Sequence, residues 1–255
     1  MPGGQNGNPG NNLLTRSLSI IIPAYNEEKR LPATLERIQN YLAGAGWKFS
    51  EVVVVDDGSR DGTAAMVQAF ARRAPAVRLL RNPGNRGKGY SVRHGMLDAK
   101  GEWAVFTDAD LSSPIEELEK LWTRAQEARA QVAIGSRALD RSLIGVHQPA
   151  FRETAGKLFN VAVRVMTGLP FWDTQCGFKL FETRAAQEIF RRQQLERFGF
   201  DVEVLFIARK LGYLAIEVPV RWNDVAGTKV GTLNGLSAFL DPMRVRLNQM
   251  QGKYR

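Results

Sequence analysis

Short apolar runs alternate with longer amphipathic stretches along the first half of the chain. The runs are four or five residues long, and they cover residues 18–22, 52–55, 77–80, 103–107 and 132–135. Between them, apolar residues recur at helical spacing over residues 29–42, 62–73, 88–99 and 114–128. Short strands that alternate with helices are typical of an α/β fold, so the pattern predicts one mostly parallel central sheet flanked by helices.

The second half of the chain has a less regular pattern. Residues 151–166 and 200–211 show helical spacing, and shorter strands are predicted around residues 179–181 and 213–220. Residues 168–178 fit neither period and predict an irregular segment. Neither an internal repeat nor a linker divides the sequence, so we interpret the 255 residues as one large domain with short additions.

The two ends of the chain differ from the domain between them. Residues 1–16 are rich in Gly and Asn and offer almost nothing to bury, which predicts a disordered tail. Residues 17–232 form the predicted domain, and residues 233–255 form a basic amphipathic segment. No stretch approaches the roughly 18 to 20 uninterrupted apolar residues of a membrane-spanning helix.

Acidic and glycine-rich motifs follow four of the predicted strands in succession. They occupy residues 23–28, 56–63, 85–89 and 107–110. Because open parallel sheets bind ligands beyond the carboxyl ends of their strands, we expect these motifs to meet in one site.

Asp108 and Asp110 flank a single residue directly after a predicted buried strand. Two carboxylates this close repel one another unless a cation lies between them, and Mg²⁺ or Mn²⁺ prefers such oxygen ligands. The alternative interpretation is that one acid caps the following helix and the other is solvated. The position beside the other strand-end motifs favours a divalent metal site.

Lys88 and Asp57 are further charged candidates at the strand ends. Lys88 lies between Gly87 and Gly89 at the start of a predicted helix, where an ammonium group can reach a diphosphate. A solvated surface lysine is the alternative. Asp57 can accept hydrogen bonds from a ribose or a base edge, although Asp-Gly is also a strong turn former.

The motifs that are missing and the overall charge narrow the class of protein. The sequence has no Gly-x-x-x-x-Gly-Lys-Ser/Thr loop and no Gly-x-Gly-x-x-Gly after the first strand, which argues against P-loop phosphotransferases and dinucleotide oxidoreductases.

The net charge of +9 favours an anionic partner. A nucleic-acid-binding protein is the alternative, but no nucleic-acid module is recognisable and strand-end acids would repel a phosphate backbone, so we expect no nucleic acid. The single cysteine, Cys176, fits a cytoplasmic protein.

The strand-end motifs together resemble the nucleotide-sugar domain of the inverting glycosyltransferases of family 2. Two downstream segments, residues 173–179 and 200–203, resemble the branch that glycosylates dolichyl or other polyprenyl phosphates. Within it the sequence looks most like the dolichyl-phosphate β-glucosyltransferases, with the dolichyl-phosphate mannose synthases as a second resemblance. The resemblance implies a single Rossmann-like domain of the family A glycosyltransferases that uses Mg²⁺ or Mn²⁺.

The resemblance also implies roles for individual residues. The donor would contact Pro23, Ala24, Tyr25, Glu27, Asp57, Lys88, Asp108, Ala109 and Asp110. Asp108 and Asp110 would hold the metal, and the catalytic set would comprise Asp108, Asp110, Gln175 and Asp201. The acceptor phosphate would contact Ser136, Arg137, Arg152 and Lys229, with Trp222 nearby.

The implied reaction moves glucose from UDP-glucose to a polyprenyl phosphate. A phosphate monoester carries about −1.5 to −2 charges near neutral pH, so it needs cations around it but no general base. A soluble hydroxyl acceptor would instead need a carboxylate within about 3 Å, for which Asp173 or Asp201 is available. Mannose transfer from GDP-mannose is the other alternative.

A lipid acceptor places part of the enzyme at a membrane surface. Since the sequence lacks a spanning segment, we expect a cytoplasmic protein attached peripherally to the cytoplasmic face of the membrane. Residues 151–166 and 243–255 are candidates for this contact because they combine apolar side chains with Arg and Lys. The alternative is that both are ordinary helices packed on the domain.

Overall fold

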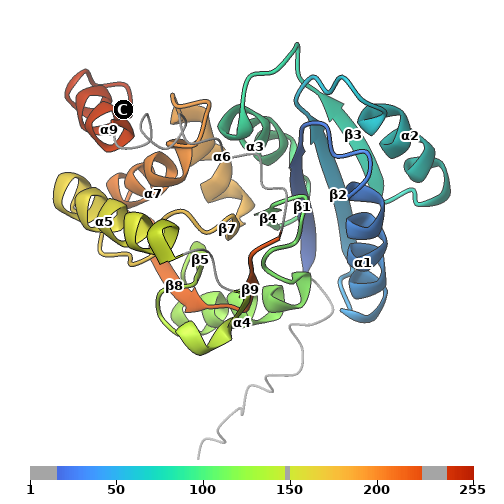
Figure 1. Cartoon of the computed structure of the whole chain (residues 1–255), viewed down its shortest axis with the longest axis horizontal. Coiled ribbons are helices and arrows are strands. Elements are labelled where there is room, and N and C mark those ends of the chain that lie inside the picture. The colour runs from blue at the N-terminus through green and yellow to red at the C-terminus, as the bar shows by residue number, and fades with distance from the viewer. Residues whose placement is uncertain (1–15, 147–149, 226–239) are drawn as a thin grey trace, which may run out of the picture.

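A seven-stranded sheet with helices on both faces forms the centre of the computed structural model, which describes residues 16–146, 150–225 and 240–255 (Figure 1). The strand order is β3-β2-β1-β4-β7-β5-β8. The strands are β1 (Ser17–Ala24), β2 (Phe49–Asp56), β3 (Val77–Arg81), β4 (Trp103–Thr107), β5 (Val132–Ser136), β7 (Phe178–Glu182) and β8 (Ala215–Pro219). The covering helices are α1 (Leu31–Gly44), α2 (Thr63–Arg73), α3 (Lys88–Asp98), α4 (Leu118–Ala128), α6 (Thr183–Arg192) and α7 (Phe200–Lys210), with a 3-10 turn at Ile115–Glu117 before α4. The predicted mostly parallel sheet flanked by helices is confirmed.

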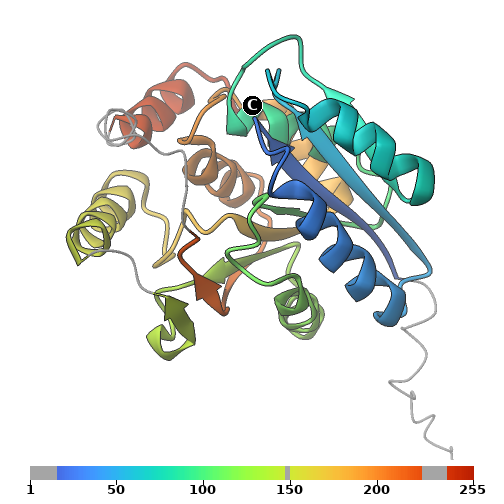
Figure 2. The same cartoon turned by 45° about the vertical axis from the view of Figure 1, so that its right-hand side comes forward.

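The uninterrupted apolar runs in the sequence reflect burial of the sheet on both faces. Ile20 and Val52 belong to the core that α1, α2 and α4 cover, whereas Ile21 and Val53 belong to the core that α3, α6 and α7 cover. All four side chains are fully buried. Figure 2 shows the two layers of helices on either side of the sheet. Parallel strands covered in this way have no polar face, so their sequences do not alternate.

β1 extends past its predicted end at residue 22. Pro23 and Ala24 continue the parallel pairing with β2, opposite Val55 and Asp56. The pairing of β1 with β4 ends at Ile21, so the N–H group that proline lacks is not needed on that side.

β7 is antiparallel to both of its neighbours, β4 and β5. The other strand pairs of the large sheet are parallel. Because β7 runs in the opposite direction, its first residue, Phe178, lies beside Thr107 at the carboxyl end of β4. The irregular segment before β7 therefore reaches the strand-end motifs. The sequence pattern did not predict α6, which follows β7.

α5 (Ala150–Thr167) and α9 (Asp241–Met250) lie next to each other beside α7 (Figure 1). Val163 of α5 and Val245 of α9 belong to the same core cluster as α7. A second, small sheet pairs β6 (Ile144–Val146), which follows a 3-10 turn at Arg141–Leu143, with β9 (Trp222–Asn223). Among the helices of the described ranges, none combines the length and the apolar character needed to cross a membrane.

Residues near both ends of the described chain are packed into the domain. Arg16, which we assigned to the predicted tail, is buried, and its guanidinium lies 4.2 Å from the ring centre of Trp47 and 4.7 Å from that of Trp122. Tyr254, after α9, is fully buried. Residues 1–15 of the predicted tail lie outside the described ranges.

Candidate active site

A pocket of about 350 Å³ lies where β1, β2 and β4 end and α3 begins. All nine residues that we predicted to bind the donor line it. The remaining lining residues are Arg30, Asn85, Gly87, Ser91, Arg197 and Phe198. The strand-end motifs therefore meet in one cavity, as the topology of a parallel sheet requires.

Contacts with two other segments hold the turn that carries Asp108 and Asp110. The Thr34 hydroxyl of α1 donates a hydrogen bond to the Ala109 carbonyl oxygen at 2.6 Å. On the other side the turn packs against Gly177, where a Cβ atom would overlap the Asp108 carboxylate. Gly177 precedes β7, so the antiparallel strand brings the second half of the chain against the acid pair.

Cations of the protein face both carboxylates of this turn. Lys88 Nζ lies 2.6 Å from Asp108 Oδ1, and Arg30 Nη1 lies 3.7 Å from Asp110 Oδ2. The other oxygen of Asp110, Oδ1, accepts hydrogen bonds from the Ser112 N–H at 2.9 Å and the Ser112 hydroxyl at 2.8 Å. Asp110 thus stabilises its own turn and still presents one oxygen to the pocket.

The acid pair makes this part of the pocket suitable for a metal and a diphosphate together. Burial alone would lower the pKa of Lys88, but the nearby carboxylates of Asp108 and Asp201 raise it above its ordinary value, so the lysine is charged. The described residues contain no group of three or more His, Cys, Asp or Glu side chains that could hold a metal. Two carboxylates completed by substrate phosphates are a usual environment for Mg²⁺, which fits Asp108 and Asp110.

Asp57 lines the pocket and also shapes the turn that presents Lys88. Its Oδ1 accepts the Arg86 N–H at 3.0 Å and the Asn82 side-chain amide at 2.8 Å, while its Oδ2 accepts the Gly87 N–H at 2.8 Å. Gly87 has a φ angle of 106°, a left-handed value that favours glycine. Asp57 therefore stabilises the turn before α3, which is a different turn from the Asp-Gly turn that we considered as the alternative to nucleoside binding.

Sequence reasoning missed the wall of the pocket opposite the strand ends. Arg197 and Phe198, between α6 and α7, form this wall. Residues 191–197 contain several arginines, and nothing in the pattern distinguishes Arg197 from the others. Arg30 was missed as well, although it lies only two residues after the acidic motif that follows β1.

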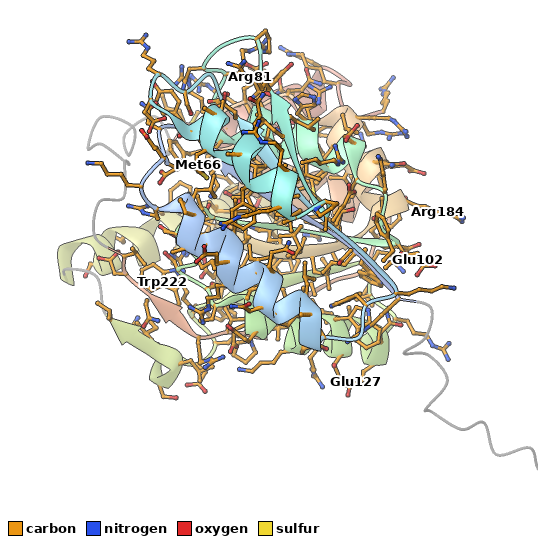
Figure 3. All side chains as sticks on the ribbon, turned by 90° about the vertical axis from the view of Figure 1, so that its right-hand side faces the viewer. Met66, Arg81, Glu102, Glu127, Arg184 and Trp222 are labelled. Atoms are coloured by element: carbon orange, nitrogen blue, oxygen red, sulfur yellow. The ribbon has the colours of Figure 1, made fainter. Side chains whose placement is uncertain are left out.

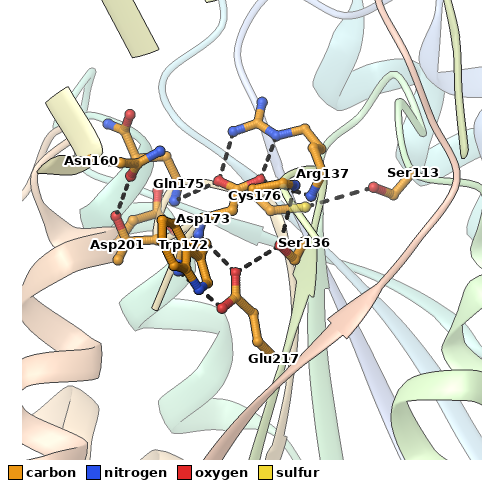
Figure 4. A network of polar contacts seen from close by, with 12 residues as sticks. Ser113, Ser136, Arg137, Asn160, Trp172, Asp173, Gln175, Cys176, Asp201 and Glu217 are labelled. Carbon is orange, nitrogen blue, oxygen red and sulfur yellow. Dashed lines mark hydrogen bonds and ion pairs between the residues drawn. The ribbon is translucent and has the colours of Figure 1, made fainter. Parts of the chain in front are cut away.

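A second cluster of charged residues surrounds the segment before β7, as Figure 4 shows. Arg137 forms a bidentate ion pair with Asp173, with Nε to Oδ2 at 2.6 Å and Nη2 to Oδ1 at 2.8 Å. Burial alone would raise the pKa of Asp173, but Arg137 holds it below its ordinary value. The Arg137 guanidinium also lies 5.4 Å from the ring centre of Trp222, the residue expected near the acceptor.

Glu217 of β8 joins this cluster, and sequence reasoning did not identify it. Its carboxylate accepts hydrogen bonds from the Ser136 hydroxyl at 2.7 Å, the Asp173 N–H at 2.8 Å and the Trp172 N–H at 2.9 Å (Figure 4). β8 pairs with β5, which places Glu217 opposite Ile134, two residues before Ser136. The carboxylate therefore fixes the irregular segment onto the sheet. An isolated acid in a short strand gave no sequence signal for this role.

Lys179 and Asp201 form a buried ion pair between β7 and α7. Lys179 Nζ donates hydrogen bonds to Asp201 Oδ1 and, at 2.6 Å, to the Cys176 carbonyl oxygen. Both side chains are buried, and Lys179 is 0% exposed. Asp201, a predicted catalytic residue, is thus next to the site but bonded to a lysine.

The other predicted site residues are less closely defined. Gln175 is half-buried in the segment before β7, and its N–H donates a hydrogen bond to Asp173 Oδ1 at 3.3 Å. Arg152 lies on α5, where its side chain is not described, and Lys229 lies outside the described ranges. Figure 3 shows Trp222 on the opposite side of the molecule from Glu102 and Arg184, which lie at the amino end of β4 and in α6.

Comparison with solved structures identifies the class of fold. The mannosyl-3-phosphoglycerate synthase of Rubrobacter xylanophilus superimposes with a TM-score of 0.67 at 16% identity, over 93% of this chain and 75% of that one. The glucosyl-3-phosphoglycerate synthase of Mycobacterium tuberculosis, solved with Mn²⁺, UDP and glucosyl-3-phosphoglycerate, gives 0.61 at 18% identity, over 97% and 86%. The fold is therefore that of the family A glycosyltransferases.

Sequence comparison then gives the family. The chain belongs to glycosyl transferase family 2, whose model matches residues 19–190. The dolichyl-phosphate β-glucosyltransferase of Drosophila melanogaster is 38% identical over 225 residues, which are 84% of this chain and 69% of the relative. The human protein of that name is 34% identical over 254 residues, 94% of this chain and 78% of the relative. The protein is thus a glycosyltransferase, as the motifs predicted.

Proposed function

We propose that this protein transfers glucose from UDP-glucose to a polyprenyl phosphate such as dolichyl phosphate. The observation that carries the proposal is the strand-end pocket, where Asp108 and Asp110 meet Lys88 and Arg30. This chemistry suits a diphosphate with a divalent cation. Relatives that share 33% to 38% of their residues with most of this chain, and that are named dolichyl-phosphate β-glucosyltransferases, support glucose as the sugar and a lipid phosphate as the acceptor.

Asp108 and Asp110 are the proposed ligands of Mg²⁺ or Mn²⁺. A divalent cation bound there would offset the negative charge that builds up on the departing diphosphate. Lys88 and Arg30 lie against the same carboxylates, so they are placed to contact phosphate oxygens once a donor occupies the pocket.

The proposed reaction is a single displacement at the anomeric carbon. An oxygen of the acceptor phosphate forms a bond to that carbon, the bond between the carbon and the diphosphate oxygen breaks, and UDP leaves with the electron pair. Attack and departure occur on opposite faces of the carbon, so its configuration inverts. The positive side chains of the pocket stabilise the charge on UDP as it forms.

The acceptor phosphate is proposed to bind beside Arg137, with Arg152 and Lys229 as further cations. Nε and Nη2 of Arg137 contact Asp173, and a guanidinium has five N–H donors in total. Ser136 is fully buried and donates to Glu217, so we expect it to support the backbone next to Arg137. The Trp222 ring under the guanidinium restricts its orientation further.

The ion pairs in this cluster favour a phosphate over a hydroxyl acceptor. A hydroxyl needs a carboxylate base, and the two candidates were Asp173 and Asp201. Arg137 holds the pKa of Asp173 below its ordinary value, and Lys179 occupies Asp201. The lowered pKa makes Asp173 a weak base, and one carboxylate oxygen of Asp201 is already bonded to the Lys179 ammonium. A phosphate oxygen needs no such base.

We further propose that α5 and α9 attach the protein to the cytoplasmic face of a membrane. Both helices expose large apolar side chains, among them Val165 at 79% and Met250 at 83%. Arg164 and Arg244 lie on the same helices. Apolar side chains next to arginines are the combination that binds anionic bilayer surfaces.

The membrane contact can be tested by vesicle co-sedimentation with anionic phospholipids. The double variant Met243→Ser, Met250→Ser should bind vesicles several-fold more weakly than the parent, because both side chains are exposed and removing them deletes only the apolar contact. Phe49→Ser, at an exposed position on β2, is the matched control. Equal binding by all three proteins would contradict the proposed surface.

The activity is tested by measuring nucleotide release. UDP-glucose is incubated with Mg²⁺ or Mn²⁺, with and without a polyprenyl phosphate, and the assay is repeated with GDP-mannose. Release of UDP that requires both the lipid phosphate and the metal is the expected result. Release of GDP alone would assign mannose as the sugar, and nucleotide binding without lipid-dependent turnover would point to a hydroxyl acceptor.

A further inference from the structure

The residues after α9 pack back onto the domain, where Tyr254 forms a buried hydrogen bond. The Tyr254 side chain is fully buried, and its hydroxyl donates to Glu203 Oε1 at 2.6 Å. Glu203 lies in the first turn of α7 and is itself fully buried. The tyrosine is therefore anchored to α7 through a carboxylate.

The second oxygen of Glu203 is bonded to the connection between α6 and α7. Oε2 accepts the Leu195 N–H at 2.8 Å and the Gln194 N–H at 3.0 Å. Gly199, at the end of this connection, packs against Asp241 at the start of α9, since a Cβ atom at Gly199 would overlap the Asp241 side chain. α9 and the residues that follow it therefore support the connection between α6 and α7 at both of its ends.

The same connection forms the wall of the donor pocket that carries Arg197 and Phe198. It also packs directly on the turn that presents Lys88. The Tyr90 N–H donates to the Glu196 carbonyl oxygen at 2.9 Å, and a Cβ atom at Gly89 would lie 2.8 Å from the Leu195 carbonyl oxygen. A shift of this wall would therefore move the groups around Lys88.

Glu203 has the properties of a group whose orientation depends on its partners. It contacts two backbone N–H groups and one hydroxyl inside a buried region, where an unsatisfied oxygen is costly. Burial raises the pKa of Glu203, and the Tyr254 hydroxyl and the two N–H groups oppose that rise. Loss of the hydroxyl would leave Oε1 without this donor, so that the carboxylate would be held through Oε2 alone.

We propose that Tyr254 and Glu203 are positioning residues for the donor: the hydroxyl holds the carboxylate, and the carboxylate holds the pocket wall against the Lys88 turn. This inference rests on the proposed function insofar as the pocket binds a nucleoside diphosphate. It assigns the segment after α9 a part in donor affinity, in addition to its packing in the core.

The test compares Tyr254→Phe with Tyr41→Phe. Both changes delete one phenol hydroxyl that donates to a glutamate, since Tyr41 bonds to Glu119 Oε1 at 2.8 Å away from the pocket. Calorimetric titration with UDP and Mn²⁺ should give a roughly three- to tenfold higher Kd for Tyr254→Phe, consistent with part of one hydrogen bond to a charged group. The KM for UDP-glucose should rise by the same factor with little change in kcat, and Tyr41→Phe should alter neither.

Hydrogen exchange provides a readout in the absence of nucleotide. Amides of residues 193–199 should exchange faster in Tyr254→Phe than in the parent, and Tyr41→Phe should leave them unchanged. Faster exchange with an unchanged Kd for UDP would overturn the proposal, because the pair would then serve the fold alone. If Tyr254→Phe does not fold, Glu203→Gln, which replaces one acceptor oxygen by a donor, should show the same rise in Kd.

The outcomes also separate this proposal from the proposed function. If the parent protein binds UDP and Tyr254→Phe binds it equally well, only the positioning role fails. If the parent binds neither UDP nor GDP with Mn²⁺, the donor assignment fails and the positioning proposal falls with it.

Discussion

The proposed donor side, around Lys88, and the proposed acceptor side, around the segment before β7, both contain lysine–carboxylate pairs, but the pairs differ in their exposure to solvent. On the donor side, the side chains of Lys88 and Asp108 are 20% and 36% exposed. On the acceptor side, those of Lys179 and Asp201 are 0% and 5% exposed. A partly exposed pair can exchange partners when a charged ligand arrives, whereas separating a buried pair leaves an uncompensated charge. We infer that Lys88 and Asp108 present their charges to ligands, whereas Lys179 and Asp201 hold the shape of the segment before β7.

The largest expected effect is on the donor side. Asp110→Ala should reduce transfer by about 10³-fold or more and abolish metal-dependent donor binding, because it removes one of the two proposed metal ligands. UDP release and calorimetric titration with Mn²⁺ measure the two effects. Asp140→Ala is the matched control, since Asp140 Oδ1 accepts the N–H and hydroxyl of Ser142 just as Asp110 Oδ1 accepts those of Ser112. Full activity of the Asp110 variant would remove this residue from the site.

The comparison itself can be tested with two lysine variants. Lys179→Met should lower the free energy of unfolding by about 3 to 5 kcal/mol, because Asp201 would stay buried without a partner. Lys88→Met should cost at most about 1 kcal/mol, because water can solvate Asp108. Urea unfolding followed by circular dichroism gives both values. Equal losses in the two variants would show that exposure does not distinguish the two sides.

A variant that loses affinity for the acceptor and keeps affinity for the donor would show that the two proposed sides bind different substrates. Arg152→Ala should raise the KM for a polyprenyl phosphate roughly tenfold, the loss expected for one charge-assisted contact. Affinity for UDP should remain close to that of the parent, which titration with UDP and Mn²⁺ checks. A parallel loss of both affinities would contradict a role at the acceptor alone.

The smallest expected effect is a pH dependence on the acceptor side. Since Arg137 holds the pKa of Asp173 below its ordinary value, the stabilisation from this pair is present above the unfolded pKa of Asp, about 3.9, and is lost as the pH falls through the lower folded value. At pH values between the folded and the unfolded pKa of Asp173, unfolding of the parent should therefore be accompanied by proton uptake. The free energy of unfolding, measured in urea from pH 6 to pH 2, should fall less steeply with decreasing pH for Asp173→Asn than for the parent. An equally steep fall in the two proteins would contradict the prediction.

Most of the donor side could be predicted from local sequence. The apolar run before Asp57 and the one before Asp108 identify buried parallel strands, and parallel strands place their following residues at one edge. All nine predicted donor residues accordingly line one pocket. Arg197 and Phe198 could not be predicted, because the connection that carries them reaches the pocket only through the packing of α6 and α7.

Less of the proposed acceptor side could be predicted, because it is built from strands that pair with segments far away in the sequence. The residues of β7 showed that a strand was present, but they did not show that it lies antiparallel between β4 and β5. For the same reason the sequence did not show that Lys179 pairs with Asp201, which lies 22 residues away on α7. Glu217 and Tyr254 gave no signal either, since an acid in a strand and a tyrosine after a helix are ordinary residues until their neighbours are known.

The sequence by itself determined the class of fold, the edge of the sheet where the pocket lies and the acid pair that lines the pocket. These follow from periodicity and strand direction, which are local properties of the chain. Only the tertiary structure decided which charged residues are exposed to ligands and which are buried in ion pairs. Burial and partner choice depend on contacts between segments far apart in the sequence, because the cost of an unpaired charge is set by everything that surrounds it.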